Sequence, residues 1–198
     1  MTARRTAAMM VAAAVLLNLA FTGLGMVFDY PDVLKHPSAD VLAAFRASQG
    51  VVSAWFLLLA LGAALLAPVA VGVGRLSTAR AMRFAVPVGV AAAAVQVVGL
   101  LRWPVLVPGW AAENDVDAFA IANQVLGNLV GETFGYLLTA TWTGLVLVAL
   151  GARFAGRLFV ALGGAAAVLI LWGCSHSWRC RSSTSPTSSA TCCGASGC

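Results

Sequence analysis

Charged residues are scarce in this chain, and several residue types that carry chemistry are nearly absent. Only 10% of the 198 residues are charged, and there are seven acids and two histidines. A soluble domain has roughly 25% charged residues, so the composition excludes an ordinary soluble domain. Hydrophobic residues make up 61% of the chain. We therefore predict an integral membrane protein.

Sequence motifs of the common enzyme classes are also missing. There is no phosphate-binding loop, HExxH, GxSxG or dinucleotide fingerprint. His36 and His176 both fall outside the apolar runs, which argues against a haem held between helices. The basic residues flank apolar runs and do not gather on a soluble face, so nucleic acid is not an expected partner. We predict no catalytic residue, no metal and no cofactor, and a non-enzymatic function.

Long uncharged runs indicate the fold class. A hydrocarbon core of roughly 30 Å needs about 20 apolar residues of helix, and the runs show none of the alternation of barrel strands. Arg4 and Arg5 precede the first run, which is longer than the core of a signal peptide, so we predict an uncleaved helix. We predict an all-α transmembrane helix bundle over residues 1–173. Its five predicted spans are residues 6–28, 50–74, 84–101, 131–150 and 158–173.

The distribution of arginines predicts the orientation. The N-terminus and the second and fourth connections carry arginine and no acid, whereas the first and third connections contain three acids each. Basic residues face the cytoplasm, so the N-terminus is predicted to be cytoplasmic. The arginines that support this orientation are Arg4, Arg5, Arg75, Arg80, Arg83, Arg153 and Arg157.

The first connection contains a candidate amphipathic helix. Pro37 is followed by Ser38, which is a suitable helix cap. Val41, Leu42 and Phe45 then share one side of the helix. We predict a short helix lying in the membrane interface. An ordinary polar loop with a little helix is the alternative.

The last 25 residues differ in composition from the rest of the chain. All five cysteines lie in residues 174–198, among many serines, but CxxC spacing is absent. This favours a disordered Ser/Cys-rich tail over a metal-binding or disulfide-linked one. Read one base upstream, the codons of Thr191–Cys198 permit an apolar sequence. We therefore predict that a frameshift near residue 173 replaced a sixth span, and resequencing the gene tests this.

The stretch LGNLVGETFGY carries the single acid of an otherwise uncharged run from Ala118 to Leu150. Counting back about 20 residues from Leu150 places Glu132 near the outer boundary of its span, level with Arg102. The two residues are candidates for a charge-assisted pair. We predict that this pair joins the third and fourth spans. The alternative is a small transporter or ion-binding module that uses Glu132 and Arg102, with Glu132 binding a proton, a cation or a polar headgroup.

Polar residues and glycines recur every four residues around Glu132. The polar row is Gln124, Asn128, Glu132 and Tyr136. The adjoining row is Gly127, Gly131 and Gly135, and small residues at this spacing let another helix approach closely. Gln96 in the third span is a further polar group for the contact. The predicted candidate site is Arg102, Glu132, Gln124, Asn128, Tyr136 and Gln96.

Aromatic residues gather at the predicted outer boundary. Such residues commonly anchor a protein in the membrane interface. We predict this role for Tyr30, Trp55, Trp103 and Trp110. The predicted partners are the lipid bilayer and either a second copy of the chain or another membrane protein; the sequence leaves any small-molecule ligand undefined.

Three stretches resemble a known family: FDYPDVL (Phe28–Leu34), GLLRWPVLVP (Gly99–Pro108) and GETFGYLLTATWT (Gly131–Thr143). They are similar to uncharacterised bacterial membrane proteins catalogued as domain of unknown function family 4386, over about residues 6–172. The resemblance implies a small multi-pass helical protein, usually with six spans, and no established activity. Members commonly have His after the Glu, where this chain has Thr133, which disfavours a proton relay.

Overall fold

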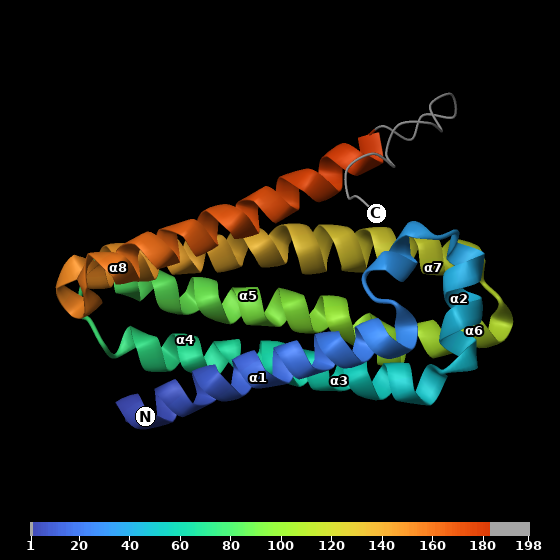
Figure 1. The fold of residues 1–198 in the computed structure, drawn as a ribbon, viewed down its shortest axis with the longest axis horizontal. Coiled ribbons are helices and arrows are strands. Elements are labelled where there is room, and N and C mark those ends of the chain that lie inside the picture. Colours follow the sequence, from blue (N-terminus) through green and yellow to red (C-terminus); the bar gives the residue numbers. More distant parts are fainter. Residues whose placement is uncertain (1, 183–198) are drawn as a thin grey trace, which may run out of the picture.

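The computed structural model describes residues 2–182, and these are helical without any strand. The all-α prediction is confirmed for this part of the chain. Four helical segments are long and apolar enough to cross a membrane (Figure 1). A further apolar helix, Gly156–Ile170, is shorter. The four long segments are Ala3–Phe28, Gln49–Gly74, Arg80–Glu113 and Val116–Ala152.

The first segment is helix α1 (Ala3–Phe28), which has a defined cap at each end. The side chain of Thr2 accepts a hydrogen bond from the backbone N–H of Arg5 at the start. Asp29 ends the helix with a φ of 51°, and its N–H donates to the carbonyl of Leu24. A 3-10 turn, η1 (Asp32–Lys35), and helix α2 (Ser38–Ala47) follow.

The second segment contains α3 (Gln49–Ala64) and α4 (Leu66–Gly74), which continue in nearly the same direction (Figure 1). Pro68 lies just after their junction, where its missing N–H interrupts the α-helical hydrogen bonds. The third segment contains α5 (Arg80–Val105) and α6 (Val107–Glu113). Its end is marked by Asn114 in the left-handed conformation, with a φ of 56°.

The fourth segment changes helix type along its length. Asp115 caps α7 (Val116–Ala122) by accepting from the N–H of Ala118 at 2.9 Å. A π-helix, η2 (Asn123–Phe134), continues into α8 (Gly135–Ser182). Backbone hydrogen bonds in a π-helix join residues five apart. Such stretches are rare in proteins, and those that occur are often found at functional sites.

Helix α8 turns back on itself near its middle, so its second half runs antiparallel over its first (Figure 1). Gly151 and Gly156 have φ values of 60° and 80°, which glycine adopts without a steric penalty. An added Cβ at Gly163 would come within 2.7 Å of Leu147, so the two halves pack closely. The parts of α8 before Gly151 and after Gly156 therefore form two antiparallel halves.

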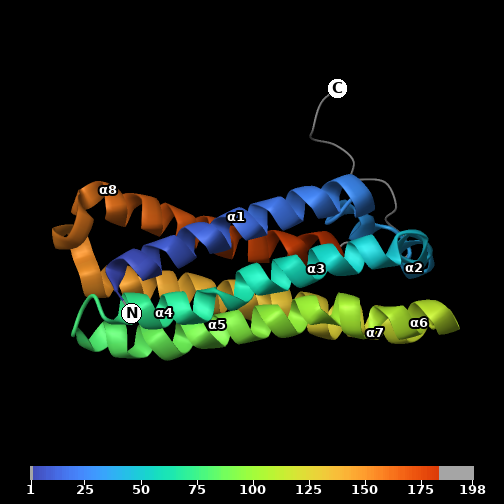
Figure 2. The same ribbon diagram turned by 90° about the horizontal axis from the view of Figure 1, so that it is seen from below.

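Two ends of the bundle differ in charge. We call the end formed by η1, α2, α6 and α7 the cap end, and the opposite end, with the α4–α5 connection, the arginine end (Figures 1 and 2). The cap end carries six of the seven acids: Asp29, Asp32, Asp40, Glu113, Asp115 and Asp117. Arg75, Arg80 and Arg83 lie at the arginine end.

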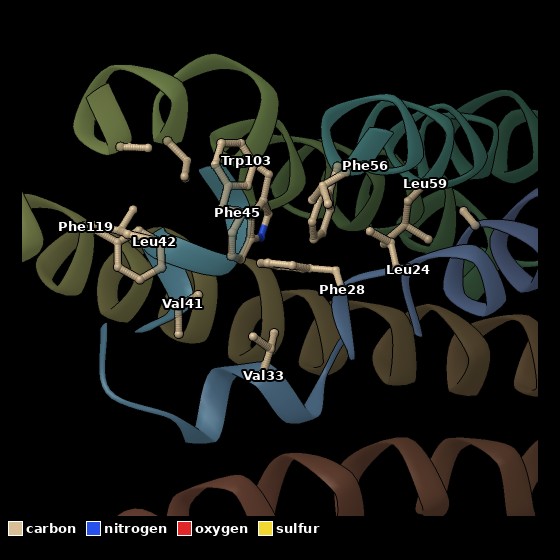
Figure 3. Packing of buried hydrophobic residues seen from close by; sticks show 14 residues of the cluster. Leu24, Phe28, Val33, Val41, Leu42, Phe45, Phe56, Leu59, Trp103 and Phe119 are labelled. Carbon is tan, nitrogen blue, oxygen red and sulfur yellow. The ribbon is translucent and has the colours of Figure 1, made fainter. Parts of the chain in front are cut away.

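The largest buried core lies toward the cap end and is built on aromatic rings (Figure 3). Trp103 is fully buried and stacks on Phe56, with ring centroids 4.7 Å apart. Phe28 meets the same indole edge-on at 5.2 Å. We call Phe28, Phe45, Phe56, Trp103 and Phe119 the aromatic cluster; all five are buried.

The structure corrects the prediction that Trp103 anchors the protein in the membrane interface. Its side chain is 0% exposed and packs inside the protein. Tyr30, Trp55 and Trp110 are partly buried and also pack against this core. Aromatic residues suit a lipid interface and a helix-packed core equally well, so their composition alone did not separate the two environments.

Helix α2 forms as predicted, but its apolar side faces the protein. Val41, Leu42 and Phe45 are all buried, and the helix packs on α6 and α7. Pro37 occupies the N-cap position that the sequence suggested for Ser38. The membrane-interface placement of this apolar side is therefore corrected.

Several helix ends also differ from the predicted span boundaries. The third segment continues to Glu113 instead of ending at residue 101, and the fourth begins at Val116 instead of residue 131. Both extensions contribute buried residues at the cap end, including Val107 and Phe119. The packing of these residues on the core stabilises both helices beyond the length that is needed to cross the hydrocarbon core of a bilayer. Helix α8 continues to Ser182, past the predicted start of the tail at residue 174, and residues 183–198 lie outside the described part.

Candidate functional site

Arg102 is a buried cation on the last turns of α5, with only 5% of its surface exposed. Its Nη1 donates to the carbonyl of Gly99, and its Nη2 donates to Oδ1 of Asn123 at 2.9 Å. The guanidinium carbon lies 5.3 Å from the centre of the Trp103 ring. Among the described residues, no acceptor reaches its Nε. A buried guanidinium with an unused donor is energetically unfavourable unless a further acceptor binds it.

Glycines let α5 and η2 approach closely enough to hold this guanidinium. A Cβ added to Gly127 would lie 2.7 Å from Nη2 of Arg102. A Cβ added to Gly99 would lie 2.8 Å from the Cα of Gly131. At Gly99 the overlap is with backbone atoms, so the contact requires glycine there, whereas at Gly127 the Arg102 guanidinium would have to move.

Gln96 extends this contact toward the arginine end. It lies beside Gly135, where an added Cβ would come within 3.1 Å of the Gln96 Cγ. Its Nε2 donates to Oγ1 of Thr139 on α8 at 2.9 Å. The three predicted packing glycines thus face α5 in succession, each against a different residue of that helix.

A cavity of about 260 Å³ lies beside this contact, between α1, α3, α5 and η2. Four of the six predicted site residues line it: Gln96, Arg102, Glu132 and Tyr136. Tyr30, which we predicted as an interface anchor, also lines it. Its apolar lining includes Leu17, Phe21, Leu59 and Leu100. The cavity therefore combines one cation, one acid, an amide and two phenols with an apolar lining.

Gln124 and Asn128 do not line this cavity, although they belong to the predicted polar row. Gln124 is exposed and Asn128 is half-buried. The Thr133 hydroxyl donates to the Asn128 carbonyl, five residues earlier, at 2.8 Å. Of the predicted polar row, Glu132 and Tyr136 line the cavity.

Tyr30 is held in its protonated form at neutral pH. Burial raises its pKa to about 12; the nearby Glu132 and Tyr136 act in the same direction, and Arg102 acts in the opposite one. The ring also stacks on Phe21, with centroids 6.0 Å apart. A neutral phenol beside the cavity can donate a hydrogen bond to a ligand oxygen.

Sequence reasoning missed several residues of the site. Asn123 holds Arg102 but lies outside the predicted fourth span, and Thr139 was not considered as the partner of Gln96. Phe21 and Leu59 lacked any signal beyond their apolar character. The polar character of Asn123, one residue before the start of the predicted polar row, was the signal that could have identified it.

Comparison with known proteins gives no information on the function of this chain. No family model matches the chain, and no curated protein or solved structure matches it either. The resemblance to the family of unknown function therefore stays a prediction.

Proposed function

We propose that the protein is a non-enzymatic integral membrane protein that binds a ligand in the cavity beside Arg102. One observation carries the proposal: a buried guanidinium with an unpartnered Nε lines the same cavity as Glu132, Gln96, Tyr30 and Tyr136. A contact that served packing alone would need neither the cavity nor the unused donor. The Gly127, Gly131 and Gly135 row supplies the close approach that positions the guanidinium.

The proposed ligand presents an oxyanion to Arg102. A guanidinium offers five donors in a planar fork suited to carboxylate and phosphate oxygens. Two of its nitrogens are used by Gly99 and Asn123, which fix the plane of the group. The remaining Nε–H and the phenol of Tyr30 are suitable donors for one bound oxyanion.

Decyl phosphate, an amphiphile with an oxyanion head, tests this proposal on the purified protein in maltoside micelles. At a concentration one hundred times its Kd, it should stabilise the native protein by about 2.7 kcal/mol. The melting temperature should rise by several degrees, and the fluorescence of Trp103 should change because its ring lies against Arg102. The variant Arg102→Gln should lose both responses.

Arg46→Gln is the matched control, because Arg46 is exposed at the cap end. It should respond as the wild type does. If Arg102→Gln does not fold, Arg102→Lys replaces it and should respond weakly, since lysine keeps the charge without the fork. A wild type that ignores decyl phosphate, or equal responses from Arg102 and Arg46 variants, would refute the proposal.

A proton- or ion-binding module is the second candidate, because Glu132 is the single acid between residues 118 and 150. The neighbouring Arg102 disfavours a bound cation by electrostatic repulsion. Glu132→Gln in proteoliposomes separates the candidates. Altered ion or proton flux with an intact fold supports transport, whereas unaltered flux leaves ligand binding as the proposal.

The proposed location is a bacterial plasma membrane, with the arginine end in the cytoplasm and the cap end outside. Arg102 follows Arg83 by nineteen positions, which is about 29 Å of α-helix and close to one hydrocarbon thickness. The cavity then lies at the outer edge of the bilayer. We include in this proposal a fifth span within residues 158–173 and a sixth lost to a frameshift.

Single cysteines test the orientation once the five native cysteines are replaced by serine. His36→Cys at the cap end should react with a membrane-impermeant maleimide added to intact cells, because His36 is exposed. Arg80→Cys, exposed at the arginine end, should react only after the cells are opened. The reverse pattern would overturn the proposed orientation.

A further inference from the structure

The cavity beside Arg102 contains both signs of charge in a small volume. Arg102 and Glu132 are the two ionisable side chains of opposite sign among its lining residues. An anion bound there is attracted by Arg102 and repelled by Glu132, and a cation experiences the reverse. A ligand that carries an oxyanion and an ammonium a few atoms apart is attracted at both ends. On these grounds, and resting on the proposed function, we infer that the ligand is a zwitterionic headgroup.

Aromatic rings favour an ammonium as the positive part. Phe21, Tyr30 and Tyr136 line the cavity with Glu132. The faces of such rings attract ammonium groups, by about 0.5–2 kcal/mol depending on desolvation. Phe21 stacks on Tyr30 with the ring planes 29° apart, which fixes the orientation of the Phe21 ring. Glu132, Phe21 and Tyr136 form the half of the site that binds the ammonium, and the Tyr30 hydroxyl stays a donor to the oxyanion.

The volume matches a headgroup and excludes a whole lipid. A cavity of about 260 Å³ is several times the roughly 30 Å³ that one water occupies in the liquid, so it accommodates a group of the size of phosphoethanolamine. An acyl chain attached to it must extend out of the cavity.

The lining of the cavity reaches the outer surface of the helices. Phe21 and Tyr136 belong to two segments long enough to cross a membrane, and they are 47% and 40% exposed. Helix α1 packs mainly on α3 and α4, whereas η2 packs on α5, α7 and α8. The side between α1 and η2 is therefore where an acyl chain can leave. A membrane lipid thus fits better than a water-soluble zwitterion.

Two lysophospholipids with the same acyl chain test the inference: lysophosphatidylethanolamine and lysophosphatidylglycerol. Both carry the phosphate, and only the first carries an ammonium. The wild-type protein in maltoside micelles should bind the ethanolamine lipid at least tenfold more tightly, measured by the shift in melting temperature. Glu132→Gln should reduce this preference to near one while still binding both lipids, because Arg102 is intact.

Asp40→Asn is the matched control, since it removes an exposed acid at the cap end; it should keep the tenfold preference. If Glu132→Gln does not fold, Glu132→Asp replaces it, and a preference reduced toward one is then expected because the shorter carboxylate recedes from the ammonium. Equal binding of the two lipids by the wild type would overturn the zwitterion inference while leaving oxyanion binding at Arg102 in place. If the wild-type protein bound neither lysolipid nor decyl phosphate, the proposed function would be overturned as well.

Soluble phosphoethanolamine forms the last arm of the experiment. It should bind at least a hundredfold more weakly than the lysolipid, because it lacks the acyl chain that lies between α1 and η2. Comparable binding of the soluble compound would show that the source is a free zwitterion and overturn the assignment to a lipid.

Discussion

Replacing Trp103 with alanine is expected to destabilise the protein by about 3–5 kcal/mol, the range for a fully buried aromatic side chain. Four aromatic rings of the cluster lie within 5.9 Å of the indole, measured between ring centroids. They come from α1, α2, α3 and α7, so one truncation leaves a cavity bordered by four elements. The melting temperature in detergent should fall by many degrees, with loss of near-ultraviolet circular dichroism.

The conservative variant Trp103→Phe should be far milder. It keeps an aromatic ring and removes an indole N–H for which no acceptor exists among the described residues. Removing a buried donor that has no partner is favourable, and this offsets part of the free energy of folding that is lost with the packing. Trp110→Ala is the matched control, because Trp110 is only partly buried against the same cluster, and it should cost roughly 1 kcal/mol. Equal losses for Trp103→Ala and Trp110→Ala would contradict a cluster centred on Trp103.

The long helices could be predicted from the sequence because hydrophobicity over 20 residues has one stable solution in a bilayer. The ends of these helices at the cap end could not be predicted in this way. Val107 on α6 and Phe119 on α7 extend the helices past the predicted boundaries because they belong to the buried core that these helices share with α2. That packing depends on contacts between residues distant in the sequence, which hydropathy does not report.

The residues of the candidate site could be predicted where they stand out from the apolar sequence around them. A lone acid, a lone arginine and three glycines four apart identified Glu132, Arg102 and the close helix contact. The sequence did not indicate the π-helix, because no residue pattern requires hydrogen bonds five residues apart. The four-residue spacing groups Gln124 with Glu132, but Gln124 does not line the cavity. The hydrogen bonds from Arg102 to Asn123 and Gly99 were likewise not predicted.

The contact between α5 and η2 gives the second large effect, through the variant Gly99→Ala. The new Cβ would lie 2.8 Å from the Cα of Gly131 and 3.0 Å from the carbonyl oxygen of Leu126. Both neighbours are backbone atoms, which cannot rotate away as a side chain does. The helices must separate, at a cost of about 1–3 kcal/mol. A fall of several degrees in melting temperature measures this loss.

The loss of stability should decrease from Gly99→Ala to Gly131→Ala and then to Gly144→Ala. A Cβ at Gly131 would come no closer than 3.2 Å to a neighbour, so this variant should lose less stability than Gly99→Ala. Nothing lies within 4 Å of a Cβ at Gly144 on α8. Its replacement should be neutral or stabilising by up to about 1 kcal/mol, because alanine favours helix over glycine. Equal melting temperatures for all three variants would contradict the close contact.

Separation of the helices should also reach the ligand site. Arg102 donates to the carbonyl of Gly99 on its own helix and to Asn123 on η2, so it bridges the two elements that Gly99→Ala forces apart. The variant should therefore lose its response to decyl phosphate along with part of its stability. Gly144→Ala should keep the full response. A destabilised Gly99→Ala protein that still binds decyl phosphate as tightly as the wild type would show that packing and binding are independent.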